Sequence, residues 1–243
     1  MRFLFLLVLL FPSCSFADVI AQNSTWNNTV IGTKVINFEG DSQGTVGSAS
    51  SLTYDSPDVA NGENRIGIVV VGIYDTSPLA VSDVTWDGTS MTNVTSQITG
   101  SGVNEIWYLV NPPAGVTSIV VTGGSAWTVC FSATHYYSGV DQTSPIDAFV
   151  ENTGAGSKNF AGPLDTNTKN TMLVDIALKL ANDGGMNITK PGVRISRGQS
   201  GSGVSYATSY QRANNTGTNT MNETSTFTQA WNQTMLSLRN AQQ

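Results

Sequence analysis

The fold class is decided by residues Val84–Met91, which read Val-Thr-Trp-Asp-Gly-Thr-Ser-Met. Asp87 and Gly88 stand between two short runs that contain β-branched and aromatic side chains. An Asp-Gly pair suits a two-residue hairpin turn, because glycine adopts a positive φ at little steric cost. This stretch therefore predicts two antiparallel strands joined by a tight turn.

The pattern of the hairpin continues outward along the chain. Runs of β-branched and aromatic residues alternate with segments rich in Gly, Pro, Asn, Asp and Ser, as strands and turns do. No long window sustains a capped helical period, and no repeat of fixed length indicates a solenoid or propeller. We therefore predict an all-β chain folded as a single antiparallel β-sandwich of jelly-roll-like type. The expected strands are Lys34–Phe38, Ser51–Tyr54, Arg65–Tyr74, Val81–Trp86, Asn104–Val110, Ser118–Thr122, Ala126–Tyr137, Met172–Leu180, Val204–Tyr210 and Thr224–Leu238.

Four later segments carry more specific predictions. Met172–Leu180 alternates apolar residues with charged ones, which favours a strand over a helix. Thr224–Leu238 alternates a partly apolar face with a small polar one, which predicts a strand packed on one side and wet on the other. Gly184–Gly203 and Ala213–Glu223 have few apolar anchors, so both are expected to be loops or disordered segments.

The N-terminus has the anatomy of a signal peptide. Arg2 supplies a positive charge, Phe3–Phe11 is an unbroken apolar run, and Ser15–Ala17 offers small residues for a cut before Asp18. The apolar run is shorter than the roughly 20 residues that span a bilayer core. Two alternatives stay open, namely an anchor that is left uncut and a lipoprotein signal that uses Cys14.

Three parts are expected along the chain: a signal peptide (1–17), an N-terminal extension (18–34) and a β-sandwich domain (35–243). The extension would either pair with the sheet edge of a neighbour or form a flexible leader. Export would place the mature protein outside the cell or on its surface. After cleavage Cys130 is the single cysteine, and we expect it to be a small buried hydrophobe rather than a reactive thiol.

The composition disfavours several classes of partner. Only 12% of residues are charged, the net charge is −6, and the basic residues are scattered. Nucleic acids and anionic membranes both require concentrated basic surfaces. No later apolar stretch has the length of a membrane span, so none is expected in the mature chain. The expected partners are a glycan, a component of the cell envelope, or another copy of the chain.

The chain has an ordered set of segments at Asn64–Gly72, Val84–Met91, Glu105–Pro112, Ser118–Thr122 and Tyr137–Ile146, followed by a final strand that contains Trp. Together these segments resemble a widespread β-sandwich domain of bacterial surface proteins and phage structural proteins. The resemblance covers about residues 35–242, and its most specific run is Tyr137–Thr143, which reads Tyr-Ser-Gly-Val-Asp-Gln-Thr. It implies a secreted or virion-exposed, jelly-roll-like module without assigned catalytic residues. The chain departs from this pattern at His135 and Tyr136, where small residues are usual.

The search for catalytic chemistry yields little. His135 is the one histidine, so any triad or metal cluster would need it. A nucleophile elbow, zinc-ligand spacing, an EF-hand loop and a phosphate-binding loop are all missing from the sequence. Glycoside cleavage would need two facing carboxylates. Glu105, Asp175 and Asp141 are available, but no pair of them is spaced to meet on one strand, so we predict no catalytic site, cofactor or metal.

Three residues are the candidate ligand contacts, namely Trp26, His135 and Tyr136. Aromatic rings stack on sugar faces, and Trp26 lies in the polar stretch Asn23–Thr29, whereas the other tryptophans are expected in the core. The alternative for His135 is a strand histidine with its hydrogen bonds satisfied. If sequons are glycosylated in the host, the one at Asn232 requires that side chain to face solvent.

Three functions follow in order of preference. The first is a non-catalytic surface module of structural or adhesive type. The second is a carbohydrate-binding module, which a flat row of exposed aromatic rings would support. The third is an enzyme that acts on polysaccharide, which would require two carboxylates converging in a cleft. The fold by itself does not decide among them.

Overall fold

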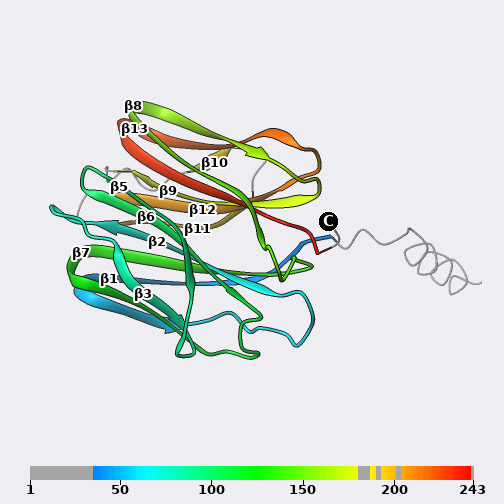
Figure 1. Ribbon diagram of the computed structural model, residues 1–243. Helices are drawn as coiled ribbons and strands as arrows, with labels where there is room; N and C mark the ends of the chain where they lie inside the picture. The colour runs from blue at the N-terminus through cyan, green and yellow to red at the C-terminus, as the bar shows by residue number, and fades with distance from the viewer. Residues whose placement is uncertain (1–34, 180–186, 190–192, 201–203, 242–243) are drawn as a thin grey trace, which may run out of the picture. The chain divides into compact units, whose positions relative to one another are not determined.

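The computed structural model describes residues 35–179, 187–189, 193–200 and 204–241, and these ranges contain strands and turns but no helix (Figure 1). The predicted all-β, antiparallel class is confirmed. In chain order the strands are β1 (Asn37–Asp55), β2 (Ile66–Tyr74), β3 (Val81–Trp86), β4 (Thr89–Ser90), β5 (Thr92–Thr99), β6 (Gly102–Val110), β7 (Ser118–Ser138), β8 (Ile146–Thr166), β9 (Thr171–Lys179), β10 (Asn187–Thr189), β11 (Val193–Ser200), β12 (Val204–Ala213) and β13 (Gly217–Leu238).

The strands form two antiparallel sheets, and each sheet comes from one half of the chain. Residues 37–138 make the first sheet, in which β1, β7, β2, β6 and β5 follow one another and β3 with β4 adjoin the first part of β7. Residues 146–238 make the second, in which β8, β13, β9, β12 and β11 follow one another and β10 adjoins the first part of β13.

The two halves therefore repeat one topology. Each begins with a long outer strand, β1 or β8, and ends with a long strand, β7 or β13, that pairs with it along nearly its whole length. Pairing is interrupted at comparable places, between Thr122 and Trp127 in β7 and between Thr224 and Gln229 in β13. The repeat lies in strand order and not in residue identity, which explains why the sequence shows no period.

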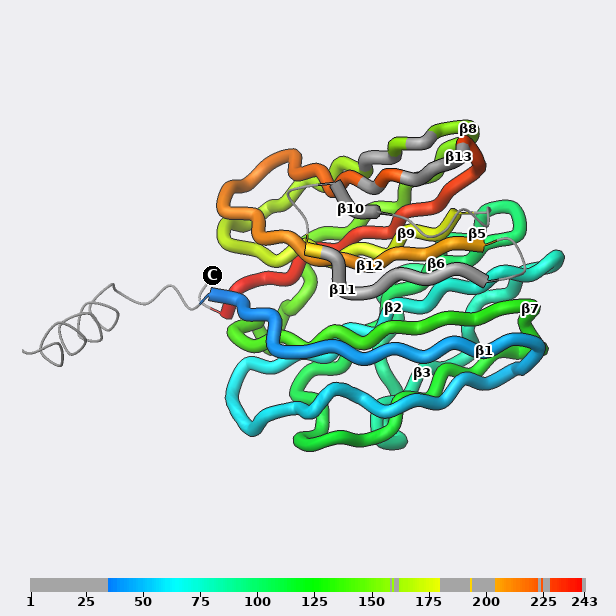
Figure 2. Tube along the Cα trace, turned by 180° about the vertical axis from the view of Figure 1, so that it is seen from behind, coloured from blue at the N-terminus to red at the C-terminus, as the bar shows by residue number. Residues whose placement is uncertain are grey.

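Each half rolls up on itself, so that the far ends of its two long strands cover the outer face of its own sheet. Figure 2 shows β1 and β7 turning back together. As a result the Tyr54 hydroxyl, at the far end of β1, lies 2.7 Å from Ser132 Oγ and 2.9 Å from Thr134 Oγ1 on β7. In the second half, a Cβ on Gly162 of β8 would collide with Met235 and Gln233 of β13. We call the halves the first roll (37–138) and the second roll (146–238).

Both rolls have an interior of their own, and a third core lies between the two sheets. The core between the sheets contains the alternate residues of β9 from Met172 to Leu178, as the sequence predicted, and the stacked rings of Phe131 and Tyr206, 3.7 Å apart. Cys130 is free and buried in the first roll, as expected. The first-roll core consists of Leu52, Val59, Val69, Val71, Ile73, Val81, Val84, Trp86, Met91, Val103, Trp107, Ile119, Val121, Trp127, Cys130 and Tyr136.

The rolled halves correct several sequence predictions. The last strand is not wet on one side, because Trp231–Leu238 is buried on both faces between the roll interior and the other sheet. The expected loop over Gly184–Gly203 contains β10 and β11, and most of Ala213–Glu223 belongs to β13. The remaining parts of the first of these segments, residues 184–186, 190–192 and 201–203, lie outside the described residues.

The predicted sandwich agrees with the structure at the level of two packed antiparallel sheets. Its jelly-roll-like detail is not confirmed, because the chain finishes the first sheet at Ser138 before it begins the second at Ile146. The predicted hairpin is confirmed: Trp86 pairs with Thr89, and both Asp87 and Gly88 have positive φ. A turn of this kind matches the twist of the two strands that it joins.

Candidate functional site

His135 lies on the face of β7 that looks toward the second sheet, and it is fully buried. Its Nε2 is 3.0 Å from Thr208 Oγ1, and its Nδ1 is 3.3 Å from the Tyr137 hydroxyl. Thr208 donates its one hydroxyl proton to the Asp175 carbonyl oxygen, at 2.6 Å. Thr208 Oγ1 must therefore accept the hydrogen bond from His135, so Nε2 of His135 carries a proton. Burial lowers the pKa of His135 to about 3, so the ring is neutral at pH 7.

Tyr136 follows on the opposite face of β7, inside the first roll. Its hydroxyl donates to the Ala60 carbonyl at 3.2 Å, and only 3% of the residue is exposed. Successive residues of a strand point to opposite faces, so the backbone itself separates these two side chains. The structure does not bring His135 and Tyr136 together, and the third candidate, Trp26, lies outside the described residues.

The three carboxylates that were considered for catalysis lie in three different places. Glu105 is buried in the first roll, where it accepts hydrogen bonds from Val81 N and from Trp107 Nε1, both at 2.8 Å. Glu105 and Trp107 therefore lie on the same face of β6. Burial raises the pKa of the Glu105 carboxyl above its usual value.

Asp175 is buried in the second roll and belongs to a polar cluster. Ser209 Oγ donates to Oδ1 at 2.5 Å, and Gln233 Nε2 donates to Oδ2 at 2.9 Å. Lys179 lies on the same face of β9 and is also fully buried. Strand alternation correctly placed Asp175 and Lys179 on one face of β9. The local sequence does not show that this face is buried, because the strands that cover it are distant along the chain.

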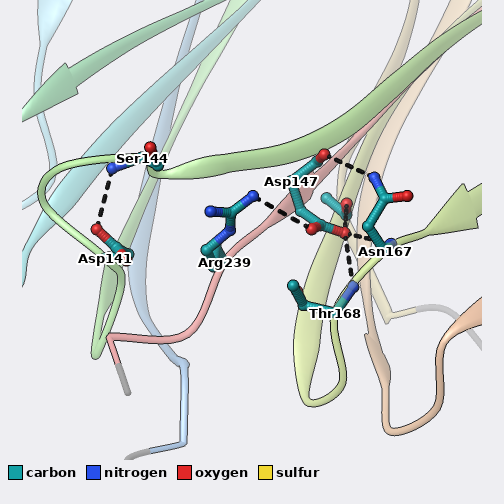
Figure 3. A network of polar contacts seen from close by, with 7 residues as sticks. Asp141, Ser144, Asp147, Asn167, Thr168 and Arg239 are labelled. Carbon is teal, nitrogen blue, oxygen red and sulfur yellow. Dashed lines mark hydrogen bonds and ion pairs between the residues drawn. The ribbon is translucent and has the colours of Figure 1, made fainter. Parts of the chain in front are cut away.

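Asp141 lies in the connection between the rolls, which Figure 3 shows from close by. Its Oδ1 accepts from the Thr143 amide at 2.7 Å and from the Ser144 amide at 3.0 Å. These hydrogen bonds, with that of Ser144 the largest, lower the pKa of the Asp141 carboxyl. Glu105, Asp175 and Asp141 therefore do not converge on one cleft in this structure.

The connection is made by the run Tyr137–Thr143, the most specific part of the resemblance. Val140 N donates to the Asn64 carbonyl at 3.0 Å, before β2, and Asp141 N donates to the Arg239 carbonyl at 2.9 Å, after β13. Gly139 has φ +77°, and a Cβ there would collide with the Val35 carbonyl. The run thus ties the entry of one roll to the end of the other, which is a structural role.

A second anchor of this connection is Asp147, at the start of β8 (Figure 3). Its Oδ2 accepts from the amides of Asn167 at 2.8 Å and Thr168 at 3.3 Å. Its Oδ1 lies 3.7 Å from the Arg239 guanidinium. These contacts hold the turn between β8 and β9 against the end of β13.

The aromatic side chains form no flat exposed row among those that the structure describes. Trp86, Trp107, Trp127 and Trp231 are all buried, as expected of strand tryptophans. Phe149, 51% exposed, is the aromatic residue among the exposed large hydrophobic side chains of these ranges. Asn232 is buried as well, so a glycan at its sequon would have no room in this fold.

A long surface feature, which the sequence pattern hardly indicated, is the outer edge of β1. This strand has 19 residues, and in the described ranges it pairs with β7 alone. Residues 42–54 contain no charged residue and no proline. The pattern of Gly, Ser and Thr suggested only two short strands at its ends. An unpaired strand edge presents a row of backbone donors and acceptors that another strand can bind.

Comparison with known proteins gives no family: no family model matches the chain, and no curated protein matches it. Within the described ranges, no group of three or more His, Cys, Asp or Glu side chains is placed to hold a metal ion. The same ranges contain no helix that is long and apolar enough to cross a membrane.

Proposed function

We propose that this protein is an exported, non-catalytic surface module of structural or adhesive type. The observation that carries the proposal is the open edge of β1, since backbone groups along an edge bind extended partners without needing a cavity. The positions of His135, Glu105 and Asp175 support it, because each side chain is buried and hydrogen-bonded inside the fold.

Export rests on the N-terminal sequence, in which Arg2, the apolar run and the small residues before Asp18 have the order of a signal peptide. The resemblance to surface and virion domains supports the same location. We also infer that the two sheets form one sandwich, since a single core fills the space between them. The resemblance further supports a sandwich of jelly-roll-like type.

The test is to incubate the purified full chain with intact cells and with a panel of insoluble polysaccharides. We expect saturable retention on cells or on the protein's own immobilised copies, and no release of soluble sugar. Retention on one polysaccharide that the matching soluble sugar competes away would instead support the carbohydrate-binding alternative. Release of soluble fragments from any polysaccharide would overturn the non-catalytic assignment.

A further inference from the structure

The two long outer strands, β1 and β8, have the same place in their rolls but differ in how their edges are protected. Natural proteins protect exposed edges with charged side chains and with proline. β8 contains Glu151 and Pro163, whereas β1 has no proline, and its charged residues Glu39, Asp41 and Asp55 leave residues 42–54 without a charge. β8 is also tied to the other sheet, because Thr95 of β5 donates to Glu151 and Gln97 donates to the Asn152 carbonyl at 3.1 Å.

The part of β1 best suited to pairing is Gly40–Gly47, where the register with β7 is uninterrupted. It lies between the irregularity at Phe38 and Gly40 and the positive φ of Ser48. Its odd-numbered residues are exposed. Asp41 is the one charged residue of this segment, so another strand can lie beside it with little electrostatic penalty.

The partner that fits this segment is a second copy of the same segment. A two-fold axis perpendicular to the sheet and passing through Gln43 would pair Gly40–Val46 with itself in antiparallel order. Each Asp41 would then lie opposite Thr45 of the other copy, so no two carboxylates would face one another. Like charges placed directly opposite in neighbouring strands are destabilising, and this register avoids them.

We propose that β1 of one molecule pairs antiparallel with β1 of a second copy, so that the two first sheets become one continuous sheet. The proposal rests on the proposed structural or adhesive function and names its partner as the same chain. The bonds that form are backbone hydrogen bonds, with Asp41 and Thr45 as the cross-strand neighbours that set the register.

Opposite charges at position 45 give the test. Thr45→Glu places a carboxylate opposite Asp41 of the second copy, and Thr45→Lys places an ammonium group there. Sedimentation equilibrium of the full chain should show a dimer in the wild type. We expect about a tenfold larger dissociation constant for Thr45→Glu, and a smaller one for Thr45→Lys, with both effects reduced by added salt.

Thr153 provides the matched control, because it is an exposed threonine on the equivalent strand β8, opposite Asn232 of β13. Thr153→Glu and Thr153→Lys should leave the dimer unchanged, and all four variants should keep the wild-type circular dichroism spectrum, which shows that the fold is intact. A monomeric wild type, or equal effects of the two Thr45 variants, would overturn the inference. If the wild type is monomeric and cells still retain it, the pairing of β1 with β1 is wrong but the adhesive function stands.

Discussion

The two rolls share one strand order but have interiors of different chemistry. The first is filled by large apolar side chains, among them Trp86, Trp107 and Trp127, and Glu105 is buried with them. Among the side chains that the structure describes, the second has a small apolar cluster, consisting of Leu164, Leu173, Ala213, Met221 and Met235, beside buried polar and charged groups.

The difference shows that the strand order does not depend on what fills the roll. Antiparallel pairing satisfies the backbone in both halves, and the interior needs only to be packed or hydrogen-bonded. An apolar interior gains stability from burial, whereas a polar one must keep every buried group bonded to avoid a penalty. The two rolls should therefore respond differently to substitution.

The largest effect is expected for Trp86→Ala. Trp86 is fully buried, and its ring lies where a Cβ on Gly67 would be. The substitution should lower the free energy of unfolding by about 3–5 kcal/mol, because a large apolar side chain is replaced by a cavity. Urea denaturation followed by circular dichroism measures this. Leu173→Ala in the second roll is the comparison, and a larger loss there than for Trp86→Ala would contradict the contrast between the interiors.

The next effect concerns His135, which joins the two rolls. Its pKa in the folded protein is about 3, below its ordinary value of 6.5, so folding favours the neutral ring. Its contribution to stability is therefore complete above pH 6.5 and is lost as the pH falls toward 3. At about pH 4.5 the loss should be about 3 kcal/mol, since one pKa unit corresponds to about 1.4 kcal/mol.

His135→Gln removes the titrating group and serves as the control for this pH dependence. Its free energy of unfolding should fall less steeply between pH 6.5 and 4.5 than that of the wild type. Parallel curves for the two proteins would show that another group controls acid stability.

A smaller effect is expected for Asp175→Asn in the polar interior. The amide keeps the size of the carboxylate but cannot accept from both Ser209 and Gln233. We expect the free energy of unfolding to fall by about 2 kcal/mol, the scale of a hydrogen bond to a charged group. Asp165→Asn on β8 is the control, because Asp165 is exposed and accepts from the Thr218 hydroxyl. Equal losses for the two would argue against the buried network.

The smallest effect is expected at the connection between the rolls. Asp141→Ala removes the acceptor of the Thr143 and Ser144 amides, which should cost about 1 kcal/mol. Asp58→Ala, at an exposed aspartate outside the connection, should change thermal stability little. If the two variants melt at the same temperature, the Asp141 contacts do not hold the connection.

Local chemistry was sufficient to predict part of this fold. The hairpin at Asp87-Gly88 and the strand over Met172–Leu180 were predicted because turn residues and apolar alternation act over short distances. By contrast β8 was not predicted, since Ile146–Thr166 is rich in Gly, Asn and Thr and includes Pro163. It is a strand because it pairs with β13, far along the chain, and local propensity does not report such pairing.

The same reasoning applies to the candidate site. For His135 the sequence left two alternatives, a ligand contact and a strand histidine with its hydrogen bonds satisfied. The structure agrees with the second alternative. His135 and Tyr136 are candidates together because both depart from the resembled pattern. Both faces of β7 are interior, and the two side chains point to opposite faces. Burial of both faces depends on the roll, in which Tyr54 and Ser132 meet from distant parts of the chain.

The division of the chain into two successive sheets has a consequence for how the protein is made. All strands of the first sheet have been synthesised once the ribosome has passed Ser138, before any strand of the second exists. During that interval Ile68, Val70 and Ile106 have no second sheet to cover them, so a nascent first roll presents an apolar surface that can aggregate. Synthesis speed beyond Ile146 would then decide how long neighbouring nascent chains have to associate.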